Sequence, residues 1–141
     1  MKITEIRFAM LRVPLKTPFK TALRTVDTIE DIVIMMHTDT GHIGYGEAPA
    51  TAVITGDTHG SIIEAISKVI APRIIGQEIA NLNRITRLIQ GALEKNSSAK
   101  AAVEIAIYDL WGQLYDAPLY RLLGGGDPVI TTDITISVDT I

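Results

Sequence analysis

The period of the hydrophobic pattern changes once along the chain, and this change limits the fold more than any other feature. In the first third of the chain, residues 6–10 alternate as in a half-buried strand, residues 29–37 are rich in Ile and Val, and residues 43–47 follow a turn as a short third strand. From Asp57 onward, apolar residues recur every three or four positions, as they do on one face of a helix. The sequence therefore predicts an α+β fold in which a three-stranded antiparallel meander is followed by a helical bundle.

Prolines and capping signals predict where the first elements end. We expect Pro14 to close the first strand, because proline removes a donor from the ladder. The first helix has capping-box spacing at Ser61 and Glu64, and we expect it to stop at Pro72.

Three more helices are predicted in the second half of the chain. One apolar stripe consists of Leu82, Ile85, Leu88, Ile89 and Leu93. The next helix, residues 99–115 with Ser98 as its N-cap, is apolar on nearly every side, so it should be buried against the sheet and the other helices. A short last helix opens at Pro118 and ends at a hinge of three glycines, residues 124–126.

Two segments of about ten residues, 16–25 and 48–57, are predicted to be loops, and loops of this length are often functional. Each contains apolar residues together with a few polar ones, and an apolar loop is costly to expose unless it covers something. Such a loop either covers a ligand or folds back on its own core, and composition alone leaves both alternatives open.

Residues 130–138 (ITTDITISV) alternate and predict a final strand. Its backbone groups need partners, which the earlier strands, another subunit or further sequence could supply. We expect the partners to lie in further sequence, so that the chain is the front part of a longer protein.

Composition excludes several classes of protein. No stretch reaches the roughly 18 apolar residues of a membrane span, and no export signal is visible, so a cytoplasmic protein that does not enter a membrane is expected. The net charge of −3 without a basic cluster argues against nucleic acid as a partner. The absence of cysteine excludes disulfides and cysteine-based zinc sites.

The acids and histidines visible in the sequence do not form a metal site. Glu47, Glu104 and Asp109 lie in structural contexts, where carboxylates mostly cap helices, pair or accept hydrogen bonds. His37, His42 and His59 lack ligand spacing and are interpreted as surface or strand-edge residues.

Several short segments, in order, resemble the enolase superfamily, and within its mandelate racemase/muconate lactonizing group they look most like dipeptide epimerases of the L-Ala-D/L-Glu type. They are residues 18–25 (PFKTALRT), 44–49 (GYGEAP), 55–57 (TGD), 98–104 (SAKAAVE), 108–113 (YDLWGQ), 118–120 (PLY), 123–125 (LGG), 132–133 (TD) and Thr135.

The resemblance implies an enolase-like N-terminal capping domain over residues 1–126, followed by a linker and the first strand of a (β/α) barrel over residues 127–141. A whole barrel takes about 250 residues. In such enzymes Mg²⁺ is held by three carboxylates of the barrel and stabilises an enediolate while two lysines move the α-proton. The resemblance therefore implies that the catalytic lysines and the Mg²⁺ ligands lie beyond residue 141.

The resemblance also implies substrate-binding roles for Arg24, Thr135, Ile54 and Phe19, with an anionic dipeptide as the substrate. The guanidinium of Arg24 suits a substrate carboxylate, although a surface arginine paired with Asp27 or Glu30 is the alternative. Thr135 would contribute a hydroxyl, whereas Ile54 and Phe19 would contribute apolar walls of a lid.

Other functions remain open. Within the superfamily, the alternatives are an o-succinylbenzoate synthase with N-acylamino-acid racemase activity and a muconate cycloisomerase. A different class is a free-standing, non-catalytic α+β module that binds a small carboxylate. A homo-oligomer is compatible with each of these.

Overall fold

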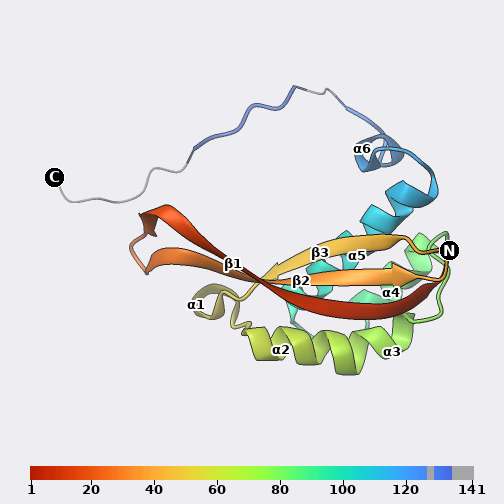
Figure 1. Ribbon diagram of the computed structural model, residues 1–141, viewed down its shortest axis with the longest axis horizontal. Helices are drawn as coiled ribbons and strands as arrows, with labels where there is room; N and C mark the ends of the chain where they lie inside the picture. Colours follow the sequence, from red (N-terminus) through yellow and green to blue (C-terminus); the bar gives the residue numbers. More distant parts are fainter. Residues whose placement is uncertain (127–128, 135–141) are drawn as a thin grey trace.

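The computed structural model describes residues 1–126 and 129–134 of the chain. Three strands form one antiparallel sheet in the order β1-β2-β3, which confirms the predicted meander; they are β1 (Ile3–Lys20), β2 (Thr25–Thr38) and β3 (Ile43–Pro49). The helical segments are α1 (Ala52–Thr55), α2 (His59–Glu64), the π-helical turn η1 (Ala65–Ile70), α3 (Ala71–Ile74), α4 (Leu82–Gln90), α5 (Ser97–Leu114) and α6 (Leu119–Leu122). Helices α2 to α5 cover one face of the sheet (Figure 1).

Strand β1 does not end at Pro14, as the sequence predicted, but continues to Lys20. It pairs with β2 alone, and a proline without an N–H is tolerated in such an edge strand. The register shifts between Pro14 and Phe19, directly after the proline. The predicted loop over residues 16–25 is therefore wrong: this segment is mostly a long hairpin with a short turn.

The first predicted helix also continues beyond the proline at which it was expected to end. Helix α2 runs directly into η1 and α3, and the helical segment ends at Ile74 rather than at Pro72. In η1 the Ala71 N–H donates to the Ile66 carbonyl, one residue further back than in an α-helix. We infer that this wider turn accommodates the proline ring, which would otherwise clash with the preceding turn. The capping box is formed by Thr58 and Ser61, three residues before the predicted pair.

The burial of α5 confirms the prediction for the long apolar helix. Seven of its side chains are buried: Ser98, Ala99, Ala102, Val103, Ala106, Ile107 and Leu110. Its N-cap is Asn96 rather than Ser98, which lies inside the helix. Among the helices that the structure describes, α5 included, none has the length and apolar content needed to cross a membrane.

The packing of α5 on β3 depends on two glycines. A Cβ built on Gly44 would lie 2.3 Å from the Ala106 carbonyl oxygen, and one on Gly46 would lie 1.9 Å from that of Ala102. The helix backbone therefore rests directly on the strand.

Side chains of α5 also satisfy the free edge of β3. Asp109 Oδ2 accepts the Tyr45 N–H at 2.9 Å, and Gln113 Nε2 donates to the Ile43 carbonyl at 2.9 Å. An exposed strand edge invites pairing with another chain, and these two side chains cap part of it.

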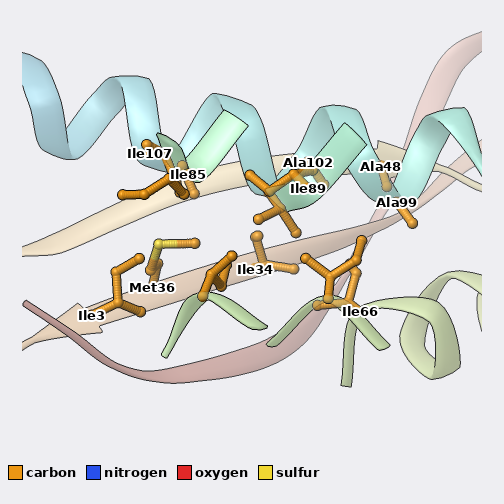
Figure 2. Close-up of a cluster of buried hydrophobic side chains, with 14 of the residues drawn as sticks. Ile3, Ile34, Met36, Ala48, Ile66, Ile85, Ile89, Ala99, Ala102 and Ile107 are labelled. Carbon is orange, nitrogen blue, oxygen red and sulfur yellow. The ribbon is translucent and has the colours of Figure 1, made fainter. Parts of the chain in front are cut away.

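The core lies between the sheet and the helices. Figure 2 shows Ile34 and Met36 of β2 among side chains from η1, α4 and α5. The predicted helical stripes supply it: Ile62, Ile66 and Ile70 from the first, and Ile85 and Ile89 from the second, are fully buried. Burying this apolar surface is the main driving force for the fold.

The first half of the predicted C-terminal strand is not paired in the described part of the chain. Residues 130–134 form no strand, and the side chains of Ile130 and Ile134 are 84% and 86% exposed. Nothing in the described part of the chain pairs with their backbone as a strand, so the alternation alone does not produce one. The rest of the predicted strand, residues 135–138, lies outside the described residues.

Candidate functional site

The β1–β2 hairpin extends past the helical layer, at the end of the molecule away from the N-terminus (Figure 1). Thr21 shapes its turn: the Thr21 hydroxyl oxygen accepts the N–H groups of Leu23 and Arg24 at 3.3 and 3.2 Å. The Thr21 N–H donates to the Arg24 carbonyl at 2.8 Å. These bonds fix the backbone of Arg24 at the start of β2.

Arg24 lines a groove of about 580 Å³ that runs from the hairpin turn along the first half of β2. The walls come from the first half of β2 and from the segment after β3, and they include Asp27, Glu30, Asp31, Pro49 and Thr51. His59 closes one side, where its Nε2 lies 3.0 Å from the Glu30 carbonyl oxygen. The groove thus joins the two segments that the sequence singled out as functional.

The alternative in which Arg24 pairs with Asp27 or Glu30 is not observed. Glu30 forms its ion pair with Arg12 of β1. Arg24 as a residue is half-buried, and within residues 1–126 and 129–134 its guanidinium forms no hydrogen bond or ion pair with another residue. A guanidinium in a groove without a partner can accept a carboxylate ligand.

The other predicted ligand residues are spread over different elements. Phe19 is half-buried in β1 opposite Val26, and Ile54 lies on α1 with 65% of its surface exposed. Neither lines the groove that contains Arg24. Thr135 lies outside the described residues.

The predicted loop over residues 48–57 is partly regular. Strand β3 continues to Pro49, and α1 occupies Ala52–Thr55. None of the residues of α1 is buried, and Val53 is 69% exposed. These apolar side chains do not fold back on the core, so that reading of the loop is wrong for this segment.

Two carboxyl groups meet on the open face of the sheet. The hydrogen bond between the side chains of Glu47 and Asp31, followed by burial and repulsion from Asp31, raises the pKa of Glu47 above its ordinary value. The pair links β2 to β3 just before the chain leaves the sheet for α1. Glu104 and Asp109 also have structural partners, as expected: Glu104 Oε1 accepts from Gln90 Nε2 at 2.6 Å, and Asp109 accepts the Tyr45 N–H.

The Glu47 pair predicts a pH dependence of stability. Between the ordinary carboxyl pKa and the raised pKa of Glu47, the native state keeps a proton that the unfolded chain has released, so stability falls as pH rises through this window. Glu47→Gln keeps a donor for Asp31 but does not titrate. We expect its free energy of unfolding, compared with that of the parent chain, to be higher by a larger amount at about pH 7 than at about pH 4. Urea unfolding at both pH values measures this, with Glu94→Gln as the control. An equal difference at the two pH values would contradict it.

The histidines occupy three different settings. His42 is exposed and bonds to Thr40, and His59 begins α2. His37 lies on the central strand β2 and not at a strand edge, in contrast to the prediction. Its Nε2 is buried, and among the described residues it has no hydrogen-bond partner. In the part of the chain that the structure describes, no three His, Asp or Glu residues lie close enough together to hold a metal ion.

Sequence reasoning missed two residues that position the site. Thr21 forms the hairpin turn, and Asp57 is a buried carboxylate whose Oδ2 accepts the Ser98 N–H at 3.3 Å. The sequence analysis included both residues only as members of longer segments, 18–25 and 55–57, and assigned no role to either. A threonine three residues before the end of a turn is a usable signal for Thr21, whereas the partner of Asp57 is 41 residues away and only the fold reveals it.

Comparisons with known proteins agree with this geometry. The chain is 48% identical to the L-Ala-D/L-Glu epimerase of Clostridium acetobutylicum over 140 residues, which cover 99% of this chain and 39% of that protein. The substrate-liganded structure of the L-Ala-D/L-Glu epimerase from Bacillus subtilis superposes with a TM-score of 0.94 at 48% identity, over 99% of this chain and 39% of that one.

A structure with a different dipeptide is also similar. The dipeptide epimerase from Enterococcus faecalis, complexed with Mg and L-Leu-L-Tyr, gives a TM-score of 0.90 at 36% identity, over 99% of this chain and 39% of that one. The chain therefore spans about 39% of the length of these relatives.

One family model covers most of the chain. The model described as the mandelate racemase / muconate lactonizing enzyme, N-terminal domain, matches residues 3–124, which include the whole sheet and all the described helices. The chain belongs to the family of mandelate racemase / muconate lactonizing enzyme N-terminal domains.

Proposed function

We propose that this chain is the N-terminal capping domain of a dipeptide epimerase of the L-Ala-D/L-Glu type. The observation that carries the proposal is the 48% identity to two L-Ala-D/L-Glu epimerases along 99% of this chain. Identity to a hydrophobic dipeptide epimerase and to an N-succinyl-L-Arg/Lys racemase is lower, at 36% and 34%. This difference favours an anionic dipeptide over the other substrates.

The proposed capping domain comprises residues 1–126, and residues 127–141 comprise a linker and the first strand of a barrel. The core cluster supports this division, because its buried members run from Ile3 to Leu110 and close the core without the C-terminal segment. Residues 129–134 are exposed and contribute nothing to that core.

In the proposed enzyme, the hairpin and the α1 loop cover the substrate. Arg24 would bind a carboxylate of the dipeptide, since it lines the groove and its guanidinium has no partner among the described residues. Ile54 and Phe19 would supply apolar wall, and Thr135 a hydroxyl. The exposure of Ile54 supports its part, because an apolar side chain left uncovered on a loop gains stability when a ligand or another domain covers it.

The chemistry would be inversion of an amino-acid α-carbon by proton removal on one face and proton return on the other. Mg²⁺ would stabilise the carboxylate-derived enediolate when bound. The described residues do not fit a Mg²⁺ site, because they contain no set of three carboxylates or histidines in reach of one ion. We therefore assign no proton transfer and no metal ligand to them, and place both in the barrel.

The direct test is the conversion of L-Ala-L-Glu by the complete protein with Mg²⁺, followed by chiral chromatography. We expect L-Ala-D-Glu to accumulate until the two epimers reach equilibrium. Turnover confined to N-acylamino acids would place the protein in the racemase branch. Binding of small carboxylates without turnover of any of these compounds would support the non-catalytic module.

Three further expectations remain predictions. They are a cytoplasmic location, the absence of nucleic acid and membrane partners, and a homo-oligomer.

A further inference from the structure

The α1 loop, residues 50–56, has little to hold it in place. Helix α1 has no buried residue, and its backbone hydrogen bonds are local: Ile54 N–H and Thr55 N–H both donate to the Thr51 carbonyl, at 2.9 Å. A segment with few buried contacts and local hydrogen bonds opens easily. Its position therefore depends on its two ends, β3 on one side and Asp57 on the other.

Of these two ends, Asp57 is unusual because its carboxylate is buried. It is 6% exposed, although a carboxylate is costly to bury without a partner. Its partner is the Ser98 N–H, in the first turn of the long helix α5. Gly56 precedes it at φ 81°, a left-handed conformation that turns the chain inward after α1.

Helix α5 needs this carboxylate. It has 18 residues, no acidic residue in its first turn, and an N-cap, Asn96, whose side chain makes no capping hydrogen bond. The first N–H groups of a helix lack partners within the helix, and the helix dipole favours a negative charge there. Asp57 supplies both the acceptor and the charge from a distant part of the chain.

We infer that Asp57 is a positioning residue that fixes the α1 loop to the N-terminus of α5 and so sets where Ile54 stands over the substrate. The inference rests on the proposed function for its effect on turnover, but not for its effect on the loop. Substrate contacts are not assigned to Asp57, which is buried behind the loop.

Two readouts on the complete protein test it. The first is hydrogen exchange of the loop amides without substrate. In Asp57→Ala we expect these amides to exchange at least ~10-fold faster, because a charge-assisted hydrogen bond is lost. The second is steady-state kinetics with L-Ala-L-Glu, where we expect KM to rise ~10-fold while kcat changes less than about 3-fold, since loop order affects binding first. Asp57→Asn keeps an acceptor and should lie between the parent and Asp57→Ala in both.

Thr58→Ala is the matched control. It removes the neighbouring N-cap of α2, a loss of stability of similar kind, but leaves Asp57 and Ser98 untouched. We expect it to leave loop exchange and KM within about 2-fold of the parent. Equal effects of Asp57→Ala and Thr58→Ala, or unchanged loop exchange in Asp57→Ala, would overturn the inference. If the complete protein turned over no dipeptide, the proposed function would fail while the exchange measurement still decided the role of Asp57.

Discussion

Replacing Gly46 by alanine should destabilise the 141-residue chain by about 3 kcal/mol. The added Cβ would lie 1.9 Å from the Ala102 carbonyl oxygen and 2.9 Å from the Ala102 carbonyl carbon. Both atoms belong to the backbone of α5, which cannot move aside as a flexible side chain would. The helix must therefore shift away from β3, and two hydrogen bonds would lengthen: the one that Asp109 accepts from Tyr45 and the one that Gln113 donates to Ile43.

Urea unfolding measures the loss, with Gly60→Ala as the matched control. Gly60 lies in α2, and a Cβ there would meet nothing closer than the Thr58 hydroxyl at 4.0 Å. Because alanine favours a helix over glycine, this control should gain about 0.5–1 kcal/mol. A Gly46→Ala chain as stable as the parent would show that α5 and β3 are not in direct backbone contact.

Arg24→Met in the complete protein should lower kcat/KM for L-Ala-L-Glu roughly ten- to hundred-fold. Removing one partner of a charge-assisted hydrogen bond in a largely dry site costs about 1.5–3 kcal/mol, which corresponds to that range. Methionine keeps the length and apolar stem of the side chain, so loss of the charge is the main change. If Arg24 reads the side-chain carboxylate, a dipeptide with an uncharged second residue should lose much less.

Lys16→Met is the control for general damage to the hairpin. Lys16 is an exposed cation on strand β1 of the hairpin and does not line the groove, so its loss should leave kcat/KM nearly unchanged. Equal losses on charged and uncharged dipeptides in Arg24→Met would assign the arginine to the α-carboxylate. No loss on either substrate would make it a surface residue without a role in binding.

The sequence predicted the parts of the fold that local pattern controls. Alternation and helical stripes located the three strands and the buried faces of α4 and α5, because each depends on burying one face. The predicted ends at Pro14 and Pro72 were wrong because they depend on structure that local pattern does not reveal. Pro14 is tolerated in an edge strand and Pro72 follows a π-helical turn, and neither circumstance is visible before the strand order and the helix geometry are known.

The candidate site was predictable only in part. Arg24 was identified by resemblance, and the fold adds that it lines a groove and that its guanidinium has no partner in the part of the chain that the structure describes. The Asp57 contact with Ser98 joins residues far apart in sequence, and the Glu47 pair depends on strand register, so neither could be read from spacing. For residues 130–134, alternation predicted a strand, but the described part of the chain contains no strand that pairs with them.

Exchange of the α-proton in deuterated water tests most directly whether this chain is the cap of an epimerase whose chemistry lies elsewhere. Proton NMR would follow the glutamate α-proton of L-Ala-L-Glu with Mg²⁺ and either the complete protein or residues 1–141 alone. We expect the signal to disappear with the complete protein and to persist with residues 1–141 as it does without protein. Exchange catalysed by residues 1–141, or none with the complete protein, would contradict this assignment.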